Sequence, residues 1–152
     1  MNKENKLIPG LPSGFEDRWN RKLILKKKLI NLIENNFIKF GFEPLETPSF
    51  EISENIGSFL ADDDNNPMSD VFSFKDGEKN ITLRYDLSSP LARFVAQNNQ
   101  DLPIPYKRYA IQNVFRNEKA GNARYREFTQ ADCDIVGNVN PAQANAELCN
   151  LI

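Results

Sequence analysis

Three arginines, Arg116, Arg124 and Arg126, surround a short glycine-containing loop near the carboxyl end of the chain. The residues on both sides of the loop alternate as in β-strands, so segment 106–137 is predicted to form a hairpin. If the hairpin is symmetric about Ala120, Arg116 lies directly opposite Arg124. Opposed like charges repel across a strand pair, and a bound anion would remove that cost. The arrangement therefore predicts a polyphosphate ligand.

The second strand of this hairpin is predicted to carry its polar residues on one face. Alternation assigns to that face Arg124, Arg126, Phe128, Gln130, Asp132 and Asp134. The other face has Ala131, Cys133 and Ile135, which suit packing against helices. Phe128 offers a ring on which a planar base can stack, and Asp134 lies farther along. This order fits a nucleotide beside a small cationic substrate.

A solvent-exposed charge network is the simpler explanation of the same residues. In that case the arginines pair with Glu118, Glu127 and Asp132, and such surface networks are common. Phe128 favours the nucleotide interpretation, because a solvated charged face gains nothing from an aromatic ring.

The same segment carries a family resemblance. Residues 115–118, the loop and residues 124–128 resemble motif 2 of class II aminoacyl-tRNA synthetases. The longer segments LRYDLSSPLARFVAQN, YKRYAIQNVFRNEK and RYREFTQADCDIVG resemble histidyl-tRNA synthetases in particular. The resemblance extends from about Leu11 to the end of the chain.

The resemblance implies an ATP site. Arg116 matches the motif 2 arginine that holds the α-phosphate and the amino acid carboxylate, which makes it the candidate catalytic residue. Glu118 matches a glutamate at the adenine amino group, Arg124 an arginine at the γ-phosphate, and Phe128 a ring stacked on adenine. Mg²⁺ is expected to accompany ATP, and no residue is assigned as a metal ligand.

The resemblance also implies a site for histidine. Asp86 and Ser88 match an acidic residue and a threonine that bind the α-amino group; serine keeps the hydroxyl that makes this hydrogen bond. Gln130 matches a glutamine near the same amino acid, and Asp134 matches the acid that reads the imidazole. The implied histidine-binding residues are Asp86, Leu87, Ser88, Arg116, Gln130 and Asp134.

A long first helix and a proline-containing strand must support these sites. Apolar residues at helical steps predict a helix over 16–40 with Gly41 as its cap, with residues 26–28 facing solvent. The residues that define its apolar face are Trp19, Leu23, Ile30, Ile33, Phe37 and Phe40. Prolines predict an extended segment over 42–50. A long helix followed by a strand with Pro48 resembles motif 1, which builds the dimer interface in class II synthetases.

Three further elements complete the prediction. Segments 71–75 and 81–85 are predicted to form a hairpin. A helix capped by Ser88 or Ser89 follows, and Asn140 precedes a last helix that continues to the end of the chain.

Composition excludes several classes of function. The 152 residues contain no histidine, which excludes imidazole catalysis and histidine-ligated zinc within this chain. Cys133 and Cys149 do not form a zinc motif or disulfide framework and indicate reduced thiols of a cytoplasmic protein. The acidic loop 62–67 lacks the ligand spacing of a calcium site. No apolar stretch has the length of a membrane span.

The expected fold class is α+β, an antiparallel sheet flanked by helices, as an incomplete class II synthetase-like catalytic core. Residues 1–152 are expected to be the N-terminal portion of the catalytic domain with motifs 1 and 2. Motif 3 and an anticodon-binding domain have no counterpart, so the chain alone is expected to be inactive. The resemblance implies a homodimer that activates histidine with ATP and transfers it to tRNA(His), without membrane or DNA partners.

Two other functions stay open. One is the synthetase-like regulatory subunit of ATP phosphoribosyltransferase, which would be an allosteric module rather than a ligase. The intact set of Arg116, Glu118, Arg124 and Phe128 favours the enzyme, since a regulatory relative need not keep ATP-binding residues. The other is an RNA-binding module without catalysis, which predicts salt-sensitive RNA affinity and no response to histidine.

Overall fold

The strands form two three-stranded sheets among residues 8–60 and 71–151, which this computed structural model describes. The first sheet contains, in spatial order, β1 (Glu43–Pro44), β5 (Tyr106–Phe115) and β6 (Glu127–Val136). The second contains β2 (Phe50–Ile52), β4 (Lys79–Leu83) and β3 (Ser73–Asp76). All pairs are antiparallel except β1 with β5.

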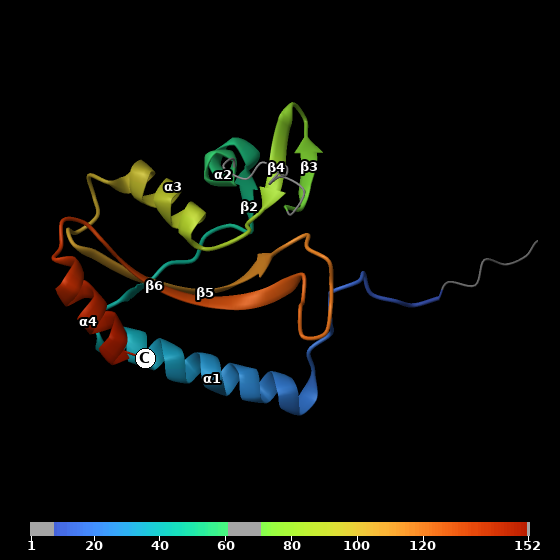
Figure 1. Cartoon of the computed structure of the whole chain (residues 1–152), viewed down its shortest axis with the longest axis horizontal. Coiled ribbons are helices and arrows are strands. Elements are labelled where there is room, and N and C mark those ends of the chain that lie inside the picture. The colour runs from blue at the N-terminus through green and yellow to red at the C-terminus, as the bar shows by residue number, and fades with distance from the viewer. Residues whose placement is uncertain (1–7, 61–70, 152) are drawn as a thin grey trace, which may run out of the picture.

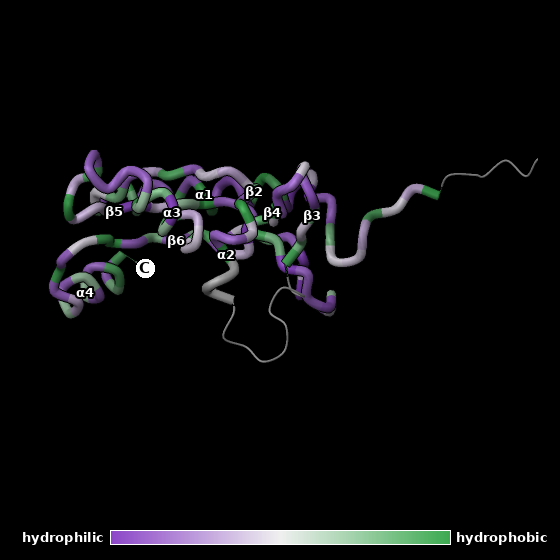
Figure 2. Tube along the Cα trace, turned by 90° about the horizontal axis from the view of Figure 1, so that it is seen from above, coloured by the Kyte–Doolittle hydropathy of each residue, from purple (hydrophilic) through white to green (hydrophobic). Residues whose placement is uncertain are grey.

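Helices cover both faces of the first sheet (Figure 1). Both α1 (Asn20–Lys39) and α4 (Pro141–Leu151) lie on one face, whereas α3 (Ser88–Asn98) lies on the other. The fourth helix, α2 (Ser53–Leu60), lies beside the second sheet, and Figure 2 shows α4 and that sheet at opposite ends. The predicted α+β arrangement is confirmed, with one parallel strand pair in addition.

Apolar side chains sort by face along β5 and β6. On the α1 side, Phe37 and Tyr109 belong to a buried cluster that includes Cys133 and Ile135. Leu148 and Leu151 of α4 join the same cluster, which completes the core on this side. On the α3 side, a smaller cluster consists of Leu87, Ala110 and Val114, with Phe128 packed against it. The helix-packing role predicted for Cys133 and Ile135 is therefore confirmed.

Directly opposed residues of β5 and β6 share a face, so each face contains contributions from both strands. The pairs on the α3 side are Arg108–Asp134, Ala110–Asp132, Gln112–Gln130 and Val114–Phe128. The predicted polar face of the second strand therefore lies toward α3 and continues onto β5.

The hairpin register differs from the predicted one. The Arg116 amide donates to the Arg126 carbonyl oxygen at 2.9 Å, so these two residues are opposed and the prediction that Arg124 opposes Arg116 is wrong. The reason lies in the loop, where Gly121 and Arg124 pair through two backbone hydrogen bonds and Ala123 adopts a φ of 59°. The centre of the hairpin thus lies one residue later than predicted and each residue of β5 meets a partner two residues later, an even shift that preserves the faces.

The first helix begins at Asn20, four residues later than the predicted start at Glu16. Trp19 precedes it in an extended conformation and is 73% exposed, so its assignment to the apolar helix face is wrong. The physical reason is a tertiary contact: Arg18 donates to the Glu127 carbonyl oxygen at 3.1 Å, which holds the preceding segment against β6.

The end of this helix agrees with the sequence. Gly41 has a φ of 76°, and the Phe42 amide bonds the Phe37 carbonyl oxygen at 3.0 Å, as in a glycine-terminated helix. Lys26 differs from the prediction, because its Nζ donates to Thr129 Oγ1 at 2.5 Å instead of facing solvent. Burial lowers the pKa of Lys26, with a further contribution from the nearby positive charge of Arg18.

The hairpin predicted over 71–85 is present as β3 and β4. At the start of α3, no serine side chain provides the cap; Asp86 Oδ1 accepts the Ser89 amide at 3.0 Å instead. Asn140 does precede α4, and its Oδ1 accepts the Ala142 amide at 3.0 Å. The predicted acidic loop 62–67 lies outside the described residues.

Candidate functional site

A cavity of about 350 Å³ lies where the β5–β6 hairpin ends. The residues that line it are Arg116, Glu118, Ala123, Arg124, Tyr125 and Phe128. The structure therefore brings together the four residues that the sequence assigned to nucleotide binding, although the predicted strand register was wrong.

Arg116 is held between two aromatic rings in this cavity. Its Cζ lies 4.4 Å from the centroid of the Tyr85 ring and 5.1 Å from that of Phe128. Its Nε makes a long hydrogen bond of 3.4 Å to the Tyr85 carbonyl oxygen. The described residues include no carboxylate paired with Arg116. The rings orient this guanidinium by cation–π contact, and its charge is available to an anion.

Glu118 is engaged by two neighbours. Arg124 forms an ion pair with Glu118, with Nε 2.8 Å from Oε2, and the Tyr85 hydroxyl lies 3.3 Å from Oε1. The surface-network explanation is thus correct for this pair. Because the Arg124 side chain is two-thirds exposed, the pair is weak and its arginine has room to reorient.

Arg126 does not line this cavity. Its Cζ lies 4.7 Å from the centroid of the Phe72 ring, and its Nη1 lies 3.4 Å from the Ser13 carbonyl oxygen. Its amide also donates to the Gly14 carbonyl oxygen at 2.8 Å. The sequence interpretation that grouped Arg126 with the other two arginines around a polyphosphate is therefore wrong. Arg126 instead contacts the amino-terminal segment at Ser13 and Gly14, a contact that the sequence did not predict.

A second group of polar side chains follows the same sheet face away from the cavity. Gln130, Asp132 and Asp134 alternate along β6, and Arg108 of β5 lies directly opposite Asp134. Burial raises the pKa of Asp132; Arg108 opposes that shift, while the negative charges of Asp134 and Asp86 add to it. The effect of Asp86 shows that the start of α3 is within electrostatic range of β6.

The turn before α3 separates its three predicted binding residues. Asp86 caps the helix, as described above, and Leu87 is 2% exposed with its side chain in the apolar cluster on the α3 side. Leu87 therefore presents only its backbone, and its carbonyl oxygen accepts a hydrogen bond from Arg108. Ser88 is exposed and lines a different cavity, described next.

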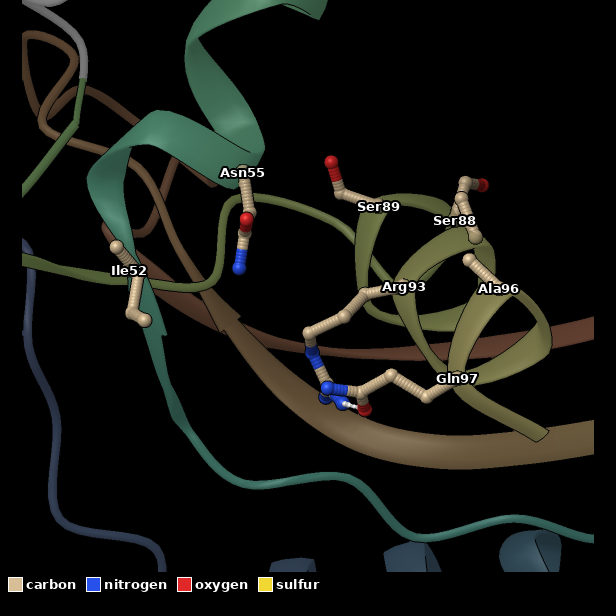
Figure 3. A pocket seen from close by; sticks show the side chains of 8 residues that line it. Ile52, Asn55, Ser88, Ser89, Arg93, Ala96 and Gln97 are labelled. Atoms are coloured by element: carbon tan, nitrogen blue, oxygen red, sulfur yellow. Dashed lines mark hydrogen bonds between the residues drawn. The ribbon is translucent and has the colours of Figure 1, made fainter.

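That second cavity, of about 770 Å³, lies between α2 and α3 (Figure 3). Its lining residues are Ile52, Asn55, Ser88, Ser89, Ala92, Arg93, Ala96 and Gln97. Gln130 and Asp134 are not among them. The structure thus places Gln130 and Asp134 on the same face of β6, with Asp86 within electrostatic range of that face, whereas the Ser88 side chain lines the separate cavity between α2 and α3.

Two residues in these groups escaped the sequence analysis. Arg108 lies on the same face as Arg116, as strand alternation from Arg116 indicates, but its burial and its pairing with Asp134 depend on the register. Tyr85 precedes Asp86 and contacts both Arg116 and Glu118. No sequence signal marked Tyr85, because those contacts connect two distant segments.

The described residues, 8–60 and 71–151, offer neither a metal site nor a membrane-spanning helix. No group of three or more acidic or cysteine side chains there has a geometry suited to a metal ion. Within the same residues, no helix combines the length and apolar character needed to cross a bilayer.

Sequence comparison identifies relatives of the whole chain. Residues 16–149 match the family described as "tRNA synthetases class II core domain (F)". Over its full length, the chain is 88% identical to a histidine–tRNA ligase of Pelagibacter ubique. It spans 33% of that relative, so about two-thirds of the relative has no counterpart in this chain.

The fold is similar to solved structures with related names. One is an ATP phosphoribosyltransferase regulatory subunit/histidyl-tRNA synthetase from Bacillus halodurans, with a TM-score of 0.80 and 26% identity over 97% of this chain and 37% of that one. Another is a histidyl-tRNA synthetase from Nostoc sp. PCC 7120, with a TM-score of 0.74 and 28% identity over 93% and 33% of the two chains.

Proposed function

This chain belongs to the family of class II tRNA synthetase core domains, and we propose that it supplies the ATP- and histidine-binding part of a histidine–tRNA ligase. The observation that carries the proposal is the cavity in which Arg116, Glu118, Arg124 and Phe128 meet, at one end of a sheet face that continues to Asp134. One surface thereby offers a phosphate site, a stacking ring and a carboxylate in order.

In the proposed first step, a carboxylate oxygen of histidine attacks the α-phosphorus of ATP. The new oxygen–phosphorus bond forms as the bond to pyrophosphate breaks, which leaves histidyl-adenylate. Arg116 holds the α-phosphate and the attacking carboxylate, because a planar guanidinium binds such oxygens in pairs and keeps its charge. Positioning and charge stabilisation supply most of the acceleration in this type of transfer, and no protein base is needed.

The nucleotide is proposed to rearrange the Arg124–Glu118 pair. Glu118 turns to the adenine amino group, Phe128 stacks on the purine, and Arg124 moves to the γ-phosphate. The exposed, weakly held side chain of Arg124 supports this change, since its present ion pair costs little to break. Mg²⁺ enters with the triphosphate; the described residues provide no cluster for it, and we assign it no protein ligands.

Histidine is proposed to bind along β6. Asp134 accepts an imidazole N–H, Gln130 and Asp86 bind toward the α-amino group, and Ser88 would join them only after a change at the start of α3. A buried polar group left unpaired by a wrong side chain costs about 1–3 kcal/mol, which provides selectivity for histidine. Transfer of the activated amino acid to tRNA(His), by a cytoplasmic homodimer, completes the proposed function.

The decisive experiment uses a chimeric enzyme in which this chain replaces the matching third of the Pelagibacter ubique relative. Histidine-dependent exchange of pyrophosphate into ATP is expected. Arg116→Ala should reduce that exchange about 10²–10³-fold, because it removes a group that stabilises charge in the transition state. Arg21→Ala, which removes an exposed arginine of α1, serves as the matched control and should leave the rate unchanged. Exchange that persists without Arg116 would contradict the proposal.

The regulatory-subunit alternative has one observation in its favour, the double name of the Bacillus halodurans structure. That function predicts a chimera without exchange that still binds a phosphoribosyltransferase tightly. An active exchange reaction therefore separates the two functions in a single assay.

A further inference from the structure

Arg108 is a buried arginine for which the proposed function has no role. It lies on β5, the central strand of the first sheet, and its side chain is 0% exposed. Its Nη2 donates to the Leu87 carbonyl oxygen at 2.9 Å and lies 2.8 Å from Asp134 Oδ2. One guanidinium nitrogen thus joins the turn before α3 to strand β6.

Burial of the Arg108 guanidinium at this position lowers the stability of the fold. A guanidinium out of water loses hydration that only good partners replace, and Nε and Nη1 of Arg108 have no hydrogen-bond partner among the described residues. The contact with Asp134 has the distance of an ion pair without the alignment of a hydrogen bond. Because well-packed apolar residues often stabilise as much as a buried pair, the charge of Arg108 requires another explanation.

The surroundings of Arg108 are acidic. The negative charges of Asp134 and Asp86 both raise the pKa of Asp132, and Arg108 is the cation that lowers it. Without Arg108, the Asp134 carboxylate would lose its contact on β5, and no cation there would offset its repulsion with Asp132.

Asp134 remains accessible on its other side. Its Oδ2 is enclosed next to Arg108, whereas the side chain as a whole keeps 36% exposure. One carboxylate oxygen thus lies against Arg108 while the side chain keeps solvent-accessible surface, so the carboxylate can accept a hydrogen bond from a ligand.

We propose that Arg108 is a positioning residue for histidine recognition. It fixes the Asp134 carboxylate and connects it to the Asp86–Ser88 turn, so that the groups for the imidazole and the α-amino group keep one spacing. This inference rests on the proposed function, because it concerns the same histidine site. Arginine suits the task because Nη2 lies in the rigid plane of the guanidinium, which fixes its position between the two acceptors, whereas a lysine ammonium on a flexible stem lacks that fixed geometry.

The test uses the chimeric enzyme with Arg108→Met, which keeps the length of the side chain and removes its charge. The KM for histidine in the exchange reaction should rise about 10-fold or more, as expected for loss of an interaction with a charged group. The KM for ATP should change less than about twofold, because the nucleotide cavity does not include this residue.

A double-mutant cycle separates positioning from general stability. In an Asp134→Asn background, Arg108→Met should raise the histidine KM by less than about twofold, since its partner is already altered. The matched control is Arg84→Met. Arg84 is also buried, but it bonds backbone carbonyl oxygens of Thr47 and Asn113. Its loss should lower stability, affect both substrates alike and show no coupling to Asp134.

Each outcome decides a different point. No histidine-dependent exchange by the unaltered chimera would overturn the proposed function and this inference together. Exchange with an unchanged histidine KM in Arg108→Met, or equal losses for histidine and ATP, would overturn the role of Arg108 alone. If Arg108→Met does not fold, Arg108→Lys decides: a selective rise in the histidine KM supports positioning, and an unchanged KM overturns it.

Discussion

Environment gives residues of one type different functions in this chain. Arg116 lies between two aromatic rings, Arg124 pairs with Glu118 at the surface, and Arg126 packs on Phe72. Of the two arginines that line the cavity, Arg116 and Arg124, only Arg116 has no ion-pair partner among the described residues. The candidate site therefore depends on the contacts of each guanidinium, and the number of nearby arginines is a poor guide to it.

Asp134→Asn tests the proposed role of Asp134 as the acceptor of the imidazole N–H. The amide keeps the shape of the side chain and loses the charge, so the histidine KM of the chimeric enzyme should rise about 10- to 100-fold. The ATP KM should stay nearly constant, since Asp134 is remote from the nucleotide cavity. Steady-state exchange kinetics give both values, and Asp17→Asn at an exposed position is the control. Equal losses for both substrates would refute the assigned role.

Asp132→Asn tests the effect of burial on a carboxylate. Because burial raises its pKa, the folded protein binds this proton more tightly than the unfolded chain does. Ionised Asp132 therefore lowers stability at neutral pH, and this cost disappears as the pH falls below about 3.9, its value in an unfolded chain. The substitution should raise the free energy of unfolding at pH 7 by less than about 1 kcal/mol, since the group is only partly buried.

Urea unfolding at pH 7 and pH 3 checks this prediction. The gain should be absent at pH 3, and Asp101→Asn, at an exposed position, should have little effect at either pH. A gain of the same size at both pH values would show that electrostatics is not the cause.

At the scale of elements, one ion pair fastens α3 to the second sheet. Arg93 Nε and Nη2 lie 2.7 and 2.8 Å from the two carboxylate oxygens of Glu51, a bidentate contact between α3 and β2. The Glu51 side chain is 4% exposed, and Arg93 also bonds Gln97 (Figure 3). The start of α3, which carries Asp86 and Ser88, is positioned in part by this contact.

Glu51→Gln is expected to lower the free energy of unfolding by about 1–3 kcal/mol, because it leaves the guanidinium with a neutral partner. The value stays below that of a fully buried pair, since Arg93 keeps access to water. Urea unfolding measures the change. The matched control is Glu54→Gln, which alters an exposed glutamate of α2. An equal loss of stability in this variant would show that the Glu51–Arg93 ion pair is not the cause.

At the scale of the whole molecule, α1 leaves an apolar stripe uncovered by the described residues. Leu25, Leu29 and Leu32 recur at helical spacing and are each more than half exposed. Pro48, predicted from motif 1 to lie at a dimer interface, is also exposed. Exposed apolar surface of this kind marks an interaction site, and the predicted homodimer would bury it.

Leu29→Lys should therefore weaken the homodimer of the chimeric enzyme by about 10-fold or more, because it places a charge in an apolar contact. Sedimentation equilibrium measures the dissociation constant. Asn35→Lys, which introduces the same residue at another exposed position of α1, should leave it unchanged. Dimerisation that is indifferent to both substitutions would place the interface elsewhere.

Sequence reasoning was most reliable where the signal was local. Gly41 marked the end of α1 because a left-handed backbone favours glycine, and Asn140 marked the start of α4. It failed at Trp19, where a distant partner decides the outcome, and at Ser88, where a neighbouring side chain provides the cap. Arg18 bonds to β6 and keeps the segment before Asn20 out of the helix, and Asp86 takes the capping role.

The sequence by itself determined the α+β class, the strand faces and the family, because alternation and motif residues are properties of the chain alone. Only the tertiary structure decided the hairpin register, the packing of Arg126 on Phe72 outside the cavity, and the pairing of Arg108 with Asp134. Register and burial depend on which distant segments meet. A shift of two residues keeps every side chain on its face and yet changes each of its neighbours.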